Sequence, residues 1–220
     1  MYHSTISFTL DTVCPWTYLA RKRLQKALDQ VRATDPPVTF TLTLNPFQLD
    51  PSFPTTPVPK SEFYNSRFGD RAALIHAHMG SLGAAEGINF AFGGVMANTL
   101  PAHRVLQVAR REKGEEAAWK VLDGLYRRYF EEEAHPSSPE TLEAACLEAG
   151  LEESWVKEVV GDEERGLQEV KRDIRNKRSE GVDSVPHIVF EGVRRDITLT
   201  GAREVDEYVK TLQAIIKESQ

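Results

Sequence analysis

Cys14 is the residue of this sequence best placed for chemistry, because it stands where a strand pattern stops and a helical pattern begins. A thiol at a helix N-terminus meets unpaired backbone N–H groups and the positive end of the helix dipole, and both favour the thiolate. The local context therefore predicts a nucleophile with a lowered pKa. Thr17 stands where a second cysteine would complete a Cys-x-x-Cys motif, so no disulfide can form within the motif.

The second cysteine, Cys146, lies on the apolar face of a predicted helix beside Leu142 and Ala145. This position favours a buried core side chain. Cys146 could resolve a mixed disulfide on Cys14 only if the helical region folds over the site. Two cysteines alone form no disulfide framework.

Other residue types that often carry chemistry form no site in this sequence. His76 and His78 are two positions apart, which places them on different faces of a helix, and no cysteine or histidine pair has zinc spacing. The glycines between positions 80 and 94 lack the preceding strand and the following Lys-Ser/Thr of a phosphate loop. We therefore expect no metal site and no tightly bound cofactor.

The composition is that of an ordinary globular protein. Of 220 residues, 40% are hydrophobic and 27% are charged, and the formal net charge of −6 gives no basic excess to attract nucleic acid. The N-terminus lacks a basic segment followed by an apolar one, and no run reaches the about 18 apolar residues of a membrane span. We expect a cytoplasmic protein that binds neither nucleic acid nor membrane.

A strand, a helix and a second strand are predicted to position Cys14. Alternation of Ile6, Phe8 and Leu10 with polar residues predicts the first strand. Apolar residues at helical spacing from Pro15 onward predict the helix, and alternation over 38–44 predicts the second strand. A unit of this size is typical of βαβ, in which the two strands are parallel.

The rest of the chain changes pattern twice. After a proline-rich loop over 45–60, the pattern is helical to about 178, with a glycine-rich break at 80–94. Glu131-Glu132-Glu133 is predicted to be a solvated helix end. Strand patterns return at 185–190 and 197–199 with Gly192 between them, which predicts an antiparallel hairpin before a last helix over 202–217.

A further signal comes from five segments of the sequence and from their order along the chain. They are Leu10-Asp11-Thr12-Val13-Cys14-Pro15-Trp16-Thr17-Tyr18-Leu19 with Arg21-Lys22-Arg23-Leu24, Asn45-Pro46-Phe47-Gln48-Leu49-Asp50-Pro51, Asn98-Thr99 with Ala102-His103-Arg104, Gly181-Val182 with Ser184-Val185-Pro186, and Gly201-Ala202. Together these segments resemble the DsbA-like family of oxidoreductases, specifically its FrnE-like branch.

The resemblance implies an α/β thioredoxin fold with a large all-helical insertion between its two halves. Residues 1–60 and 180–220 would form a discontinuous thioredoxin-like domain, and residues 61–179 the helical insertion. The resemblance also implies a cis peptide bond between Val185 and Pro186 that faces the Cys14 motif. The backbone of Val185 would then pair with an extended peptide or with glutathione, as in strand addition at a sheet edge.

One residue departs from the branch, whose members usually have Cys-Pro-Trp-Cys where this chain has Thr17. Three routes remain open. Cys14 could attack a mixed disulfide and be released by glutathione, the Thr17 hydroxyl could stabilise a thiolate of Cys14 or of bound glutathione, or activity could be lost. The second route resembles kappa-class glutathione transferases and 2-hydroxychromene-2-carboxylate isomerases, which usually begin this helix with Ser-Pro-Tyr or Ser-Pro-Phe.

Alternatives also remain for single residues. Thr17 either helps to cap the first helical turn or takes part in catalysis, and Trp16 either forms a recognition surface or packs under the insertion. Asn98 has the pattern of a helix cap, and His103 is either a solvated helix residue or part of the substrate cleft.

We therefore predict a thiol oxidoreductase with Cys14 as its single nucleophile and glutathione as co-substrate. The predicted catalytic residues are Cys14 and Thr17, and the predicted substrate- or glutathione-binding residues are Pro15, Trp16, Val185, Pro186, Gly201, Ala202, Arg203, Asn98 and His103. Gly201 to Arg203 are expected to open the last helix and to hold the γ-glutamyl carboxylate on free N–H groups. The alternatives are a glutathione transferase or isomerase and a non-catalytic binding module. Such folds can form homodimers, although no segment marks an interface.

Overall fold

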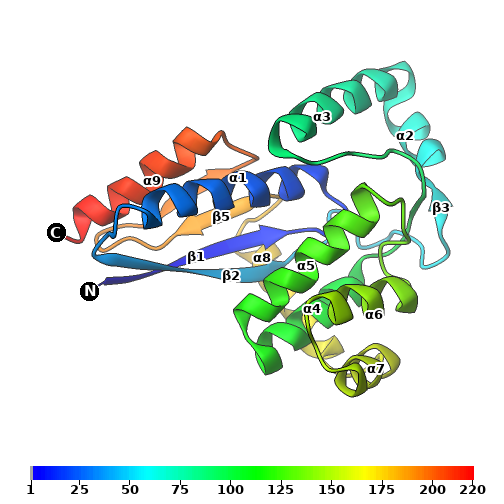
Figure 1. The fold of residues 1–220 in the computed structure, drawn as a ribbon. Helices are drawn as coiled ribbons and strands as arrows, with labels where there is room; N and C mark the ends of the chain where they lie inside the picture. The colour runs from blue at the N-terminus through cyan, green and yellow to red at the C-terminus, as the bar shows by residue number, and fades with distance from the viewer. Residues whose placement is uncertain (1) are drawn as a thin grey trace.

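A four-stranded mixed sheet forms the centre of the computed structural model, which describes residues 2–220 (Figure 1). Its strands are β1 (Tyr2–Leu10), β2 (Val38–Pro46), β5 (His187–Phe190) and β6 (Ile197–Thr200), in the order β2-β1-β5-β6. β1 pairs in parallel with β2 and antiparallel with β5, and β5 pairs antiparallel with β6. The predicted parallel βαβ unit and the predicted C-terminal hairpin are both confirmed.

Two helices lie side by side on the sheet, α1 (Pro15–Arg32) after β1 and α9 (Val205–Glu218) after β6 (Figure 1). α1 begins at Pro15 as predicted, since proline suits the first turn, where its missing N–H is not needed. Its apolar positions Leu19, Leu24 and Leu28 are fully buried, which fixes the helix and the residue before it against the sheet.

The chain between β2 and β5 is mainly helical. Its elements are β3 (Val58–Pro59), α2 (Lys60–Phe68), a short 3-10 helix (Gly69–Arg71), α3 (Ala72–Glu86), β4 (Val95–Met96), α4 (Leu100–Lys113), α5 (Glu115–Phe130), α6 (Pro139–Glu148), α7 (Glu153–Gly161) and α8 (Leu167–Ser179). β3 and β4 pair antiparallel but were not predicted, because two residues are too few to show alternation. Among residues 2–220, no helix is both long and apolar enough to cross a membrane.

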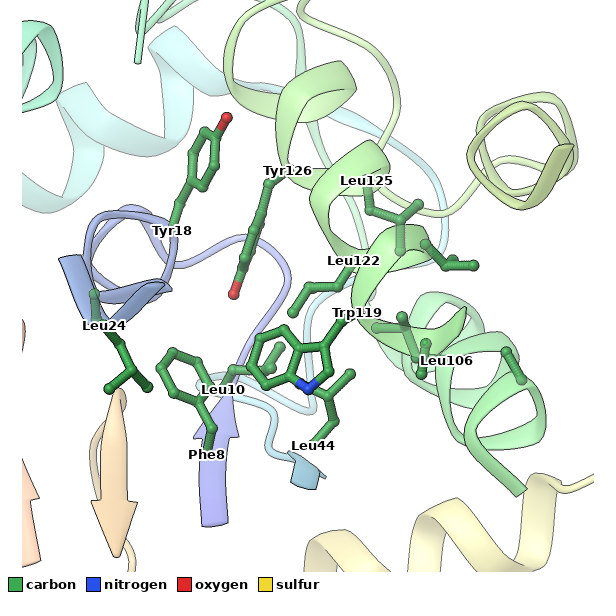
Figure 2. Packing of buried hydrophobic residues seen from close by; sticks show 14 of the residues in the cluster. Phe8, Leu10, Tyr18, Leu24, Leu44, Leu106, Trp119, Leu122, Leu125 and Tyr126 are labelled. Carbon is green, nitrogen blue, oxygen red and sulfur yellow. The ribbon is translucent and has the colours of Figure 1, made fainter. Parts of the chain in front are cut away.

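The insertion and the sheet share one hydrophobic core (Figure 2). Trp119 of α5 meets Phe8 of β1 edge to face, with ring centroids 5.5 Å apart, and Tyr126 of α5 stacks on Tyr18 of α1 at 4.9 Å. Aromatic pairs of these geometries contribute about 0.5–1.5 kcal/mol beyond the area they bury. The insertion is therefore packed directly against the end of α1 that carries Cys14.

Arg104 of α4 holds the C-terminal end of α7. Its guanidinium is buried and donates to the carbonyls of Val159 and Asp162 at 2.8 and 2.9 Å, and to those of Val160 and Arg165 at longer distances. The last carbonyls of a helix lack donors within it, so a buried guanidinium is an effective donor there. Arg104 thus joins two helices of the insertion.

The glycine-rich segment differs from its prediction. α3 continues through Gly80 and Gly83 to Glu86 and ends where Gly87 adopts a φ of 77°. Gly83 lies inside the helix. The Phe90 ring packs so closely against it that a Cβ at this position would overlap the ring. At Gly83 the absent side chain therefore permits close packing and does not break the helix.

The acidic run Glu131-Glu132-Glu133 lies at the C-terminal end of α5, as predicted, and also makes contacts that were not predicted. Glu131 accepts from the Tyr18 hydroxyl at 2.6 Å and from the Asn89 N–H at 3.1 Å, and Glu133 accepts from the Gly93 N–H at 2.8 Å. The prediction of a solvated helix end is confirmed for Glu132 and Glu133, whereas Glu131 is half-buried. Backbone N–H groups of the irregular segment after α3 need acceptors, and Glu131 and Glu133 provide them.

Candidate active site

Cys14 is buried immediately before the first residue of α1, with an exposed fraction of 4%. Its Sγ donates to the carbonyl oxygen of Val185 at 3.6 Å, and its side chain packs with Phe47, Val182 and Val185. The structure thus brings Cys14 against the segment that leads into β5.

The protonation state of Cys14 differs from the expectation. Burial raises the pKa of Cys14 to about 12, and the Asp11 carboxylate adds to the rise. The backbone N–H groups of Thr17 and Trp16 and the Thr17 hydroxyl lower the pKa, as expected at a helix N-terminus, but desolvation outweighs them. The predicted lowered pKa is therefore wrong for the free protein, in which Cys14 is a neutral thiol near pH 7.

Thr17 connects the Cys14 turn to the insertion. Its side chain is fully buried, and its hydroxyl lies 2.6 Å from the Cys14 carbonyl and 3.0 Å from the Asp11 carbonyl. The hydroxyl also accepts from the Tyr126 hydroxyl at 2.8 Å. A hydroxyl has one proton, so a thiolate at Cys14 would compete for it with two backbone carbonyls.

The Val185–Pro186 peptide bond is cis. Val185 is 8% exposed, and its carbonyl accepts from the Cys14 thiol, while the Pro186 carbonyl accepts from the Gly201 N–H at 2.9 Å. A partner N–H that pairs with the Val185 carbonyl therefore replaces the thiol as donor or uses the second lone pair of the same oxygen.

A cavity of about 420 Å³ opens beside Cys14, between α1, α2 and α3 and the C-terminal end of α5. Pro15 and Trp16 line it next to the thiol, and Trp16 is 39% exposed, so its ring is available as a recognition surface. Eight further aromatic residues line the cavity, all but Phe53 from the insertion: Phe53, Phe63, Tyr64, Phe68, Phe90, Phe92, Tyr129 and Phe130. The volume is in the range of small-molecule sites.

The DSBA-like thioredoxin domain family matches residues 5–213 of this chain. The chain belongs to this family. A probable DsbA oxidoreductase from Streptomyces coelicolor has 25% sequence identity and a TM-score of 0.85, with 98% of this chain and 91% of that chain covered. The predicted thioredoxin fold with a helical insertion is confirmed, and the chain is thiol-disulfide oxidoreductase-like.

Two further proteins, represented by three solved structures, share the DSBA-like fold at 16% identity, which shows the fold alone. The structure of the cytosolic disulfide reductase DsbM from Pseudomonas aeruginosa has a TM-score of 0.66, with 97% of this chain and 98% of that chain covered. The structure of the same protein with GSH has a TM-score of 0.65, with 97% of this chain and 99% of that chain covered. A 2-hydroxychromene-2-carboxylate isomerase has a TM-score of 0.65, with 97% of this chain and 95% of that chain covered. A search of the curated proteins finds no match.

His103 of this DSBA-like protein lies outside the cavity wall. It is 1% exposed, and its Nε2 lies 3.1 Å from Oδ1 of Asp11, which is itself buried and accepts from the Leu49 N–H through Oδ2. Neither the solvated position nor the cleft position expected for His103 is correct. His103 contacts a carboxylate that lines the cavity, so it acts on the site only through Asp11.

Asn98 is a structural residue rather than part of the cavity wall. Its Oδ1 accepts from the Leu100 N–H at 3.0 Å and from Gln48 at 2.9 Å, and its amide donates to the carbonyls of Pro51 and Phe53. The cap-like role is thus supported, whereas the substrate-binding assignment is not, because both ends of the amide are already bonded.

The residues from Gly201 to Arg203 precede the last helix instead of opening it. Gly201 has a φ of 83° and donates to Pro186, so the chain is still turning, and α9 begins at Val205. The Arg203 N–H donates to the Tyr208 hydroxyl at 3.2 Å, and the first turn of α9 carries Asp206 and Glu207. None of Gly201, Ala202 and Arg203 lines the cavity, and the acidic first turn opposes the binding of a carboxylate there.

Cys146 lies away from the cavity wall. It is fully buried in the large core, whereas Cys14 belongs to a separate small cluster, and both cysteines are free. Burial raises the pKa of Cys146 to about 12, which matches the predicted core position.

Three residues of the site were not predicted as site residues: Asp11, Lys60 and Tyr64 all line the cavity. Asp11 raises the pKa of Cys14, and burial together with the charge of Cys14 raises the pKa of Tyr64, so both lie within electrostatic reach of the sulfur. The sequence offered one signal for Asp11, namely that its carboxylate directly follows an apolar strand. Lys60 and Tyr64 come from an amphipathic helix that gives no such signal.

Proposed function

We propose that this chain is a thiol oxidoreductase of the FrnE-like branch that works through Cys14 alone and uses glutathione as co-substrate in the cytoplasm. The observation that carries the proposal is the position of the Cys14 sulfur at a helix start, beside a cavity and against the Val185 carbonyl. A disulfide partner can reach the sulfur there and align its backbone with the segment before β5. The structure of DsbM with GSH supports glutathione as the thiol partner.

The proposed cycle needs one cysteine of the protein. Cys14 loses its proton and attacks one sulfur of a substrate disulfide, forming a Cys14 mixed disulfide while the second substrate sulfur leaves as a thiolate and takes up the proton. A glutathione thiolate then attacks the substrate sulfur of the mixed disulfide, which releases Cys14 and leaves a glutathione–substrate disulfide.

The raised pKa favours the reducing direction of this chemistry. Strongly oxidising proteins of this chemistry owe their potential to a stabilised reduced form. Burial and the Asp11 charge disfavour the Cys14 thiolate, so the reduced form lacks the thiolate stabilisation of strongly oxidising proteins, while the neutral thiol keeps its hydrogen bond to the Val185 carbonyl. Thr17 and the backbone N–H groups of the first turn are left to stabilise the thiolate as it forms.

A glutathione transferase or isomerase is the second candidate, and the aromatic cavity favours it. The cavity can hold an apolar substrate beside a glutathione thiolate, to which the Thr17 hydroxyl would donate. In this alternative Cys14 is dispensable. Absence of both the oxidoreductase and the transferase or isomerase activity would identify a non-catalytic binding module. A homodimer is compatible with any of these functions.

A paired assay separates the candidates. Glutathione-dependent reduction of 2-hydroxyethyl disulfide and conjugation of 1-chloro-2,4-dinitrobenzene are measured side by side for the wild type, Cys14→Ser, Thr17→Val and the matched control Cys146→Ser. We expect Cys14→Ser to abolish reduction and Cys146→Ser to leave it unchanged. Reduction that survives Cys14→Ser overturns the proposal, and conjugation that survives it while Thr17→Val abolishes it supports the transferase.

A further inference from the structure

Lys60 places a buried ammonium group in the wall of the aromatic cavity. The residue is 4% exposed, and its Nζ donates to the Tyr129 carbonyl at 2.9 Å and lies 3.8 Å from the centre of the Tyr129 ring. Within residues 2–220, no carboxylate lies at ion-pair distance from Lys60, although many surface lysines and arginines of the chain have such a partner. A buried charge without a counter-ion is costly unless an anion completes the site.

The charge state of Lys60 is consistent with anion binding at neutral pH. Burial lowers the pKa of Lys60 to about 8, and the charge of Glu133 acts in the opposite direction. The ammonium form therefore still predominates at pH 7. Glu133 lies beyond ion-pair distance of Lys60, and its carboxylate accepts from the Gly93 N–H.

His76 supplies a second unsatisfied group in the same wall. Its ring stacks on Phe92, with centroids 4.3 Å apart, and meets the Tyr64 ring edge-on. Its Nε2 is buried and has no hydrogen-bond partner among the described residues. Buried polar atoms are normally paired, so this nitrogen points to a bound group that supplies the partner.

We infer that this cavity binds a flat aromatic molecule with a single anionic group, the anion at Lys60, the ring between the aromatic side chains and a polar substituent at His76. The aromatic walls match a ring by stacking and edge contacts. Arg67 is a second cation in the cavity wall, but the three carboxylates Asp11, Asp50 and Asp183 outnumber the two cations, which disfavours a polyanion such as a nucleotide. The inference rests on the proposed function and deepens it, because this is the cavity beside Cys14, but binding itself requires no thiol chemistry.

Two fluorescent probes with the same aromatic frame test the inference. 1-Anilinonaphthalene-8-sulfonate carries one negative charge, and N-phenyl-1-naphthylamine carries none. We expect wild-type protein at pH 7 to bind the anion more tightly. Lys60→Met should weaken anion binding about tenfold, which corresponds to one lost charge-assisted contact, and should leave binding of the neutral probe within about twofold.

Controls make each outcome decisive. Lys120→Met removes an exposed lysine that pairs with Glu116 and should change neither probe's affinity. If wild-type protein binds the neutral probe as tightly as the anion, the inference is wrong whether or not Lys60→Met folds. Equal anion binding by wild type and a folded Lys60→Met also overturns it. Cys146→Ser, outside the cavity wall, should change neither probe's affinity. Probe binding is read without any thiol reaction, so loss of the proposed redox function and failure of this site are distinguishable.

Discussion

The Cys14 thiol and the Val185 carbonyl, 171 positions apart in the sequence, are joined by a hydrogen bond of 3.6 Å. This bond exists only while the sulfur carries its proton, because a carbonyl oxygen cannot donate. Formation of a thiolate or a disulfide at Cys14 therefore leaves a buried acceptor without a donor. A substrate N–H that reaches Val185 restores the bond, so chemistry at the sulfur and docking at Val185 are coupled.

Alkylation of native Cys14 should be slow at neutral pH. Since its pKa is raised to about 12, the thiolate fraction should rise about tenfold per pH unit over the whole range below that value. Iodoacetamide labelling rates from pH ~6 to ~10, read by mass spectrometry on the Cys14 peptide, measure this dependence. A rate that levels off below pH ~8.5, the value of a free thiol, contradicts the burial of the thiol.

Replacement of Asp11 by asparagine should speed this labelling at every pH below the pKa of Cys14. The substitution removes the negative charge that raises the thiol pKa, while the amide keeps an acceptor for the Leu49 N–H. Asp50→Asn is the matched control, because Asp50 also lines the cavity but does not contribute to the Cys14 pKa. Equal rates for wild type and Asp11→Asn would falsify the electrostatic role of Asp11.

Thr17→Cys should create a disulfide within the motif. Thr17 follows Cys14 by three positions at the first turn of α1, and its buried hydroxyl already faces the sulfur closely enough to lower the thiol pKa. Mass spectrometry after mild oxidation should show the loss of two hydrogen atoms within one peptide, together with a gain of dithiol oxidase activity. A variant that stays reduced under these conditions argues against the thioredoxin-like placement of the motif.

The sequence patterns predict the sheet well and the site less well. β1, α1, β2 and the C-terminal hairpin follow from periodicity and proline or glycine positions, which are local properties. The Cys14 pKa was wrong because local rules describe the helix start, whereas burial depends on Phe47, Val182 and Val185, which the fold brings from elsewhere. Lys60 likewise becomes unusual only after Tyr129 packs over it.

Gly83→Ala should destabilise the protein although alanine favours helices. A Cβ at Gly83 overlaps the Phe90 ring, which is itself held between Tyr18 and Phe130. We expect a loss of about 1–3 kcal/mol in the free energy of unfolding, typical of overpacking. Gly80→Ala is the control in the same helix, because its Cβ would lie 3.9 Å from Phe92, and it should be neutral or stabilising by up to about 1 kcal/mol. Urea denaturation of both variants measures the difference, and equal stabilities exclude the proposed overlap.

Arg104→Met should destabilise the insertion. The substitution leaves the final carbonyls of α7 without their buried donor, which should cost about 3 kcal/mol of unfolding free energy. Arg172→Met provides a comparison at an exposed arginine whose nearest carboxylate, on Asp173, is 3.7 Å away, and it should change stability by less than about 0.5 kcal/mol. Thermal denaturation of the two variants tests this, and a stable Arg104→Met protein shows that water replaces the guanidinium.

The central position of β1 has a consequence for protein synthesis. β1 pairs with β2 on one side but with β5 on the other, and Ser4 bonds to Glu191 across 187 positions of sequence. During translation, the β5 side of β1 stays unpaired until the whole insertion has left the ribosome, a delay of about 10–40 s at the usual elongation rates. An open strand edge is a site for mispairing with other chains. The nascent N-terminal half is therefore the form of this protein most in need of a chaperone.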